Sequence, residues 1–139
     1  MVVTDTYLTI EAAAEAGSRE RGSKFLAFAY MVENEADIKV RLEALKRKYH
    51  DATHHCYGWR LWWGAETGFD ERTRANDDGE PSGTAGKPIL NQIVATGLTN
   101  VLIVVVRYFG GTKLGVPGLT RAYKEAATEV IANCKIVER

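Results

Sequence analysis

Apolar positions recur with two different periods along the chain, and these periods predict its secondary structure. Three segments carry apolar residues at the spacing of one helical face. They predict helices over 36–49, 84–96 and 117–133. Asn34 can cap the first helix, and Gly97 can end the second.

Strand-like segments separate these helices. Alternation predicts a long strand over 53–63, and strand-like composition marks 7–10, 24–31 and 69–75. We expect 7–10 and 24–31 to form a loose hairpin. Segment 101–106 is almost entirely β-branched, which is typical of a strand buried on both faces.

Together these elements predict an α/β (α+β) fold. We expect a two-layer sandwich, in which a mixed sheet of four or more strands has helices mainly on one face. Four residues on the inner sides of these elements should be buried in its core: Leu42, Ile93, Val104 and Ile131.

Length and charge narrow the class of protein. The chain has 139 residues, which predicts a single domain over 1–139. Lys+Arg and Asp+Glu are both 18, so no global basic field attracts nucleic acid, and an RNA site would be a local patch. No apolar run approaches a membrane span, and two cysteines are too few for a disulfide framework. We expect a cytoplasmic protein without membrane contact.

The turn after the buried strand is a candidate anion-binding site. Gly110 and Gly111 let the backbone turn sharply, Lys113 adds a cation, and a helix begins shortly afterwards. Arg107 could add a bidentate contact to a phosphate or carboxylate. The spacing is not that of a Walker loop. Alternatively, the glycines only allow the strand to turn into the helix.

The acidic turn before the second helix is another candidate. Asp77, Asp78 and Glu80 could hold Mg²⁺ through oxygen ligands, but the spacing is not that of an EF-hand. The interpretation that we favour is structural. The carboxylates would then face the start of the following helix, or pair with Arg107 or Lys113.

The long strand carries His54, His55 and Cys56. Alternation places the two histidines on opposite faces, which argues against a shared zinc ion. A nucleophilic Cys56–His54 pair is conceivable, although a cysteine at mid-strand usually packs under a helix. We expect no metal and no cofactor. The aromatic residues Tyr57 and Trp59, with Trp63, could stack bases, but packing is the commoner role.

The acidic turn at 77–80 and the glycine-rich turn at 107–113 thus carry opposite charges. We hypothesise that Asp78 or Glu80 approaches Arg107 or Lys113, that His54 lies nearby, and that the amides of Gly110 and Gly111 stay free for an anion. The candidate cleft comprises His54, Asp77, Asp78, Glu80, Arg107 and Lys113.

Four strings carry a family resemblance. They are Lys24-Phe25 after a Gly-Ser pair, DATHHCY at 51–57, DDGEPSGTAGKPIL at 77–90, and VVVRYFGGTKLG at 104–115. Together they resemble the IMPACT family, whose bacterial members are called YigZ, over about 22–127. The resemblance implies the fold of the second domain of ribosomal small-subunit protein five, with a left-handed βαβ unit.

The resemblance also implies a function. Eukaryotic members look like regulators of translation initiation that act by protein–protein competition. Bacterial members commonly carry a ferredoxin-like C-terminal domain, for which we expect no counterpart in this chain. We expect a non-catalytic, translation-associated regulatory or RNA/ribosome-binding module, with RNA, the ribosome or a translation factor as partner.

Two alternatives remain open. One is an enzyme or nucleotide/anion-binding protein that uses the polar cleft, and the other is a pure protein-interaction domain. Val116-Pro117 stands where the family usually has Thr-Gly, which weakens the case for a phosphate cradle in this loop.

Overall fold

The computed structural model describes residues 6–62 and 71–139. These residues form ten elements in the order β1 (Leu8–Ile10), β2 (Ala14–Glu20), β3 (Ser23–Met31), α1 (Glu35–Lys48), β4 (His54–Trp62), β5 (Glu71–Asn76), α2 (Gly86–Ala95), β6 (Val101–Tyr108), α3 (Gly115–Ala132) and β7 (Ile136–Glu138). The helices and the long strands fall where the periodicity predicted them, with ends shifted by a few residues. Trp63 and the start of the strand expected over 69–75 lie outside the described residues.

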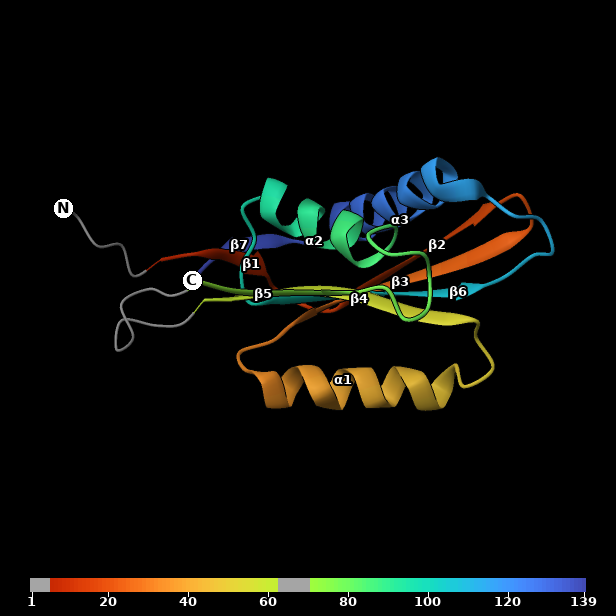
Figure 1. Cartoon of the computed structure of the whole chain (residues 1–139). Coiled ribbons are helices and arrows are strands. Elements are labelled where there is room, and N and C mark those ends of the chain that lie inside the picture. Colours follow the sequence, from red (N-terminus) through yellow and green to blue (C-terminus); the bar gives the residue numbers. More distant parts are fainter. Residues whose placement is uncertain (1–5, 63–70) are drawn as a thin grey trace.

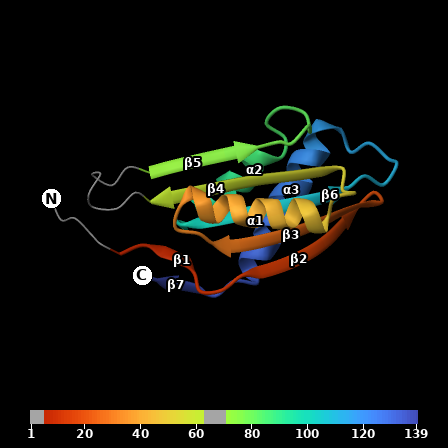
Figure 2. The ribbon, with the colours of Figure 1, turned by 90° about the horizontal axis from the view of Figure 1, so that it is seen from below.

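The main sheet has the strand order β2-β3-β6-β4-β5, and every neighbouring pair is antiparallel. The expectation of a mixed sheet is therefore wrong. Helix α1 connects the parallel strands β3 and β4, and β6 lies between them in the sheet. Helix α2 connects the parallel strands β5 and β6, and β4 lies between them. In Figure 2 the connection β5–α2–β6 crosses behind the sheet with left-handed sense.

Helices cover both faces of this sheet. Figure 1 shows α2 and α3 on one face and α1 on the other. Two of the three helices share a face, as expected, but the arrangement has three layers rather than two. The apolar stripe of α1, which includes the buried Ile38 and Leu45, requires a sheet face of its own.

Strand β6 lies at the centre of both cores. All its residues from Val101 to Val106 are fully buried, as their β-branched composition predicted. Alternate side chains enter the α2–α3 core and the α1 core. Ile93, Val104 and Ile131 are buried as predicted.

Leu42 is only partly buried, contrary to the expectation. It packs against the edge of the α1 core and also lines a hollow between α1 and strands β4 and β5. The helical period identified the face of α1 that contacts the sheet. How many residues of that face become fully buried depends on where the helix lies on the sheet, which the period does not determine.

The N-terminal hairpin was predicted with the wrong partner. Strand β3 pairs with β2 through a two-residue turn at Arg21 and Gly22, whose φ angles are +47° and +82°. Strand β1 pairs instead with β7, which the sequence did not predict. Segment 14–20 contains alanine, glutamate and glycine, which are poor strand formers, so only its pairing with β3 makes it a strand.

No helix in the described part of the chain is long and apolar enough to span a membrane.

Candidate functional site: a buried cluster around Glu80 and Arg107

A buried ion pair lies at the end of the central strand, on the sheet face covered by α2 and α3. Arg107 is the register partner of Phe25 on β3 and of His54 on β4. Its Nη1 lies 3.0 Å from Oε1 and 2.7 Å from Oε2 of Glu80. The exposed fractions of the two side chains are 5% and 4%, so water screens this pair very little.

Further groups complete the hydrogen bonding of this pair. Nε and Nη2 of Arg107 donate to Oγ of Ser23 at 3.3 and 3.1 Å. The hydroxyl of Tyr123, on α3, donates to Oε2 of Glu80 at 2.5 Å. Buried charges are tolerated when their remaining donors and acceptors are satisfied in this way.

His54 forms the partly exposed side of the cluster. Its Nε2 lies 3.3 Å from Oε1 of Glu80, and its Nδ1 lies 2.7 Å from the backbone oxygen of Asp78. The two ring nitrogens thus face two acceptors, a carboxylate oxygen and a carbonyl oxygen. The structure brings Glu80, Arg107 and His54 together, as the hypothesis expected.

Asp77 anchors the acidic turn to α2. Its carboxylate accepts hydrogen bonds from the amides of Gly83, Ala85 and Gly86 at 2.9, 3.1 and 2.8 Å. Partial burial acts to raise the pKa of this carboxyl, but these amides outweigh it and the pKa is lowered. This contact with the start of the following helix is the structural role that the sequence favoured.

The other two charged candidates are placed differently. The carboxylate of Asp78 accepts from the backbone amide of His55 at 2.6 Å, so it joins the acidic turn to β4 rather than to Arg107. Lys113 is exposed, and within the described ranges it makes no ion pair or hydrogen bond with the cluster. Of the two expected cations, only Arg107 takes part.

The expectation of free glycine amides is wrong for Gly110. Its amide donates to Oγ of Ser23 at 3.2 Å, and a Cβ at this position would lie 2.0 Å from the backbone of Gly22. A glycine is required here for close packing of two turns. Gly111, with a φ of +87°, provides the reversal of direction.

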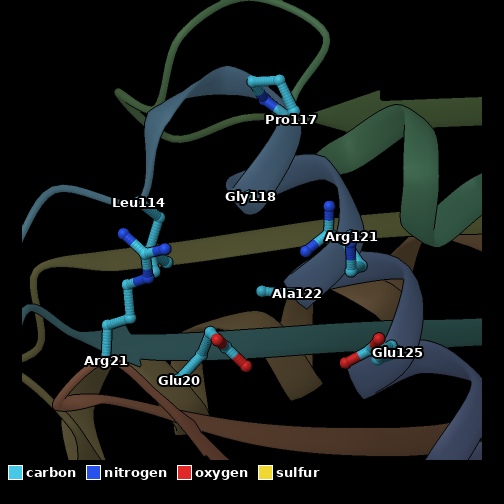
Figure 3. A pocket seen from close by; sticks show the side chains of 8 residues that line it. All are labelled: Glu20, Arg21, Leu114, Pro117, Gly118, Arg121, Ala122 and Glu125. Atoms are coloured by element: carbon cyan, nitrogen blue, oxygen red, sulfur yellow. The ribbon is translucent and has the colours of Figure 1, made fainter.

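A hollow of about 230 Å³ lies beside the start of α3 (Figure 3). Leu114 and Gly118 line it, but Gly110, Gly111 and Lys113 do not. Its four charged side chains are of both signs: Glu20, Arg21, Arg121 and Glu125. This balance of charge does not single out an anion.

Cys56 is buried beneath the cluster and is not activated. Its Sγ donates to the backbone oxygen of Asp77 at 3.1 Å. Burial raises the pKa of the thiol to about 12, and burial likewise raises the pKa of the neighbouring Tyr123. A protonated thiol is a weak nucleophile, so the geometry does not support a Cys56–His54 catalytic pair. Within residues 6–62 and 71–139, no group of three or more His, Cys, Asp or Glu residues could hold a metal ion.

The aromatic side chains of β4 mainly pack. Trp59 is 5% exposed in the core beneath α1, and Tyr57 is partly buried beside it. Two members of the cluster were missed as site residues. Tyr123 fitted the apolar stripe of the last helix, and Ser23 carried no signal other than its place in the Gly-Ser-Lys-Phe string.

The comparisons with known proteins identify the family. The model of the Impact N-terminal domain matches residues 21–131, and the chain therefore belongs to this family. It is 37% identical over 134 residues to the IMPACT family member YvyE of Bacillus subtilis, covering 96% of this chain and 59% of that protein. It is 39% identical over 101 residues to the IMPACT family member YigZ of Escherichia coli, covering 73% and 48%.

Solved structures agree with this assignment. A crystal structure of a hypothetical protein aligns with a TM-score of 0.90 and 28% identity, over 99% of this chain and 65% of that one. The structure of the two-domain translational regulator Yih1 aligns with a TM-score of 0.54 and 29% identity, over 91% and 46%. The chain thus spans between about half and two thirds of these relatives.

Proposed function

We propose that this chain is a non-catalytic binding module that acts in the regulation of translation, with RNA, the ribosome or a translation factor as its partner. The family supports the setting, because its solved relative Yih1 is described as a translational regulator. The IMPACT relatives extend beyond the matched part, so the activity of the whole protein is part of the proposal.

The saturated Glu80–Arg107 cluster is the observation that favours binding over catalysis. Arg107 donates to Glu80 and Ser23, and Glu80 also accepts from Tyr123, so the pair is held entirely by groups of the chain itself. A catalytic carboxylate or guanidinium needs an open position for substrate. This pair, almost fully buried, instead fastens the acidic turn to the central strand.

The groove between α1 and β5 is the surface that we assign to RNA. It has a volume of about 280 Å³, and its charged lining residues are Lys39, Lys46 and Arg74 together with Glu35 and Glu43. Glu35 is paired with Arg72 at 3.0 Å. None of these three cations makes an ion pair with a described residue. Partly exposed Tyr57 also lines the groove, and its ring could stack one base. Because Glu35 is already paired with Arg72, the three cations face one further carboxylate, Glu43, and a chain without net charge has a local excess of positive charge here.

Binding of a fluorescent single-stranded RNA, measured by anisotropy against salt concentration, tests this proposal. We expect Arg74→Glu and Lys46→Glu each to weaken binding about tenfold and to lower the salt slope by about 1. Lys124→Glu, on the exposed side of α3, is the matched control and should change little.

Co-sedimentation with ribosomes separates the two kinds of partner. If the chain binds neither RNA nor ribosomes, the assignment of RNA and the ribosome as partners is wrong. If it sediments with ribosomes and neither groove variant reduces this, the groove is not the contact surface and the RNA surface is misassigned.

A further inference from the structure

Strand β2 forms one edge of the sheet. The turn between β2 and β3 determines which of its backbone N–H and C=O groups point away from β3. Glu20 and Ser23 flank the two-residue turn to β3, so they form a hydrogen-bonded pair. Such pairs alternate along an antiparallel ladder. The backbone N–H and C=O groups of Glu15, Gly17 and Arg19 therefore point away from β3. The side chain of Asn133 donates to the backbone oxygen of Glu15 at 3.0 Å, which agrees with this assignment.

The charged side chains on the two sides of Gly17 have opposite signs. Glu15 lies two residues before the glycine and Arg19 lies two residues after it. Both side chains are exposed, and neither makes an ion pair or hydrogen bond within the described part of the chain. Antiparallel pairing of two such strands, centred on Gly17, places each Glu15 opposite Arg19 of the other copy.

The sheet surface beside Gly17 is hollowed. A hollow of about 320 Å³ lies over it, lined by Leu26, Phe28 and Tyr49. A second hollow, of about 460 Å³, adjoins the first at Glu15 and Phe28. Gly17 has no side chain to fill this space, and an apolar surface beside an open strand edge is suited to covering by another chain.

We propose that β2 is a self-association edge, at which a second copy of this chain adds its own β2 in antiparallel register about Gly17. In this register Gly17 pairs with Gly17 of the partner subunit. Each strand turns its outward N–H and C=O groups to the other. The backbone oxygen of Glu15 already accepts from Asn133, so it meets the N–H of Arg19 of the partner subunit with its second lone pair. The aliphatic part of Arg19 from one copy then lies beside the hollow of the other. The result is one continuous antiparallel sheet with a two-fold axis at the glycines.

Charge reversal tests this register directly. Glu15→Arg turns both ion pairs of the dimer into Arg–Arg contacts, and Arg19→Glu turns both into Glu–Glu contacts. We expect each variant to weaken dimerisation about tenfold or more, measured by sedimentation velocity from low micromolar to near-millimolar concentration. The double variant Glu15→Arg/Arg19→Glu should return to within about threefold of the unsubstituted chain, because the opposite pairs form again.

Mixing the two single variants provides a second readout. An equal mixture of Glu15→Arg and Arg19→Glu chains pairs opposite charges at both sites, so we expect a heterodimer that neither chain forms alone. Arg74→Glu, on the opposite edge strand, is the control and should leave dimerisation unchanged. A chain that stays monomeric at every concentration overturns the proposal, as does a dimer that neither reversal weakens. RNA binding at the α1–β5 groove does not depend on either outcome.

Discussion

Replacing Arg107 by methionine is the most direct test of the buried cluster. Methionine keeps much of the volume of the side chain but removes its charge and its donors. Glu80, whose side chain is 4% exposed, would lose its bond to the guanidinium and retain only Tyr123 and His54 as partners. Ser23 would lose two of its donors.

The expected magnitude follows from the burial of the pair. Removing one partner of a buried ion pair costs about 3–5 kcal/mol, because the other charge stays uncompensated. The free energy of unfolding of a domain is about 5–15 kcal/mol, so Arg107→Met should remove a large share of it. Lys135→Met is the matched control: it breaks an exposed pair with Glu11 at 3.5 Å and should cost at most about 1 kcal/mol.

Urea unfolding followed by circular dichroism measures both variants. The double variant Arg107→Met/Glu80→Met should be more stable than Arg107→Met alone, because the unpaired carboxylate is gone. If Arg107→Met costs no more than the Lys135 control, the cluster does not hold the two turns together, and the argument against a catalytic role loses its basis.

Four further predictions address the core, the acidic turn, the thiols and metals. Val104→Asp buries an unpaired charge in the α1 core and should cost several kcal/mol, so we expect no cooperative thermal unfolding; a normal transition contradicts the core assignment. Asp77→Asn replaces a charged acceptor of three amide hydrogen bonds by a neutral one and should lower stability at neutral pH by about 1 kcal/mol. Because the pKa of Asp77 is lowered on folding, its contribution is complete above the unfolded pKa and is lost as the pH falls below about 4, so the two unfolding curves should converge there. Burial raises the pKa of Cys56 to about 12, so its thiol should resist a disulfide reagent at pH 8 until urea is added, whereas the half-buried Cys134 should react faster; rapid labelling of Cys56 in the folded chain contradicts its burial. Chelator treatment should leave the melting temperature unchanged, and a fall that zinc reverses would instead favour a site at His54 and Cys56.

Much of the fold was readable because its signals are local. The unbroken apolar run, almost entirely β-branched, predicted the central strand, and helical spacing predicted the three helices of the described residues. The acidic turn was assigned correctly to the start of α2, because carboxylates beside a helix N-terminus meet its free amides. From opposite charge alone, the sequence allowed Asp78 or Glu80 to pair with Arg107 or Lys113, and the structure contains the Glu80–Arg107 pair.

Only the tertiary structure decided which of these segments meet. Helix α1 covers the sheet face opposite α2 and α3, and β3 takes β2 rather than β1 as its partner, because strand pairing and helix placement depend on contacts distant in the sequence. The same reason explains Ser23 and Tyr123, which lie 100 residues apart in number yet complete one cluster. Lys113 and Arg107 are alike in charge and close in sequence. Arg107 belongs to the site because it ends a buried strand, while Lys113 lies beyond the turn, in water.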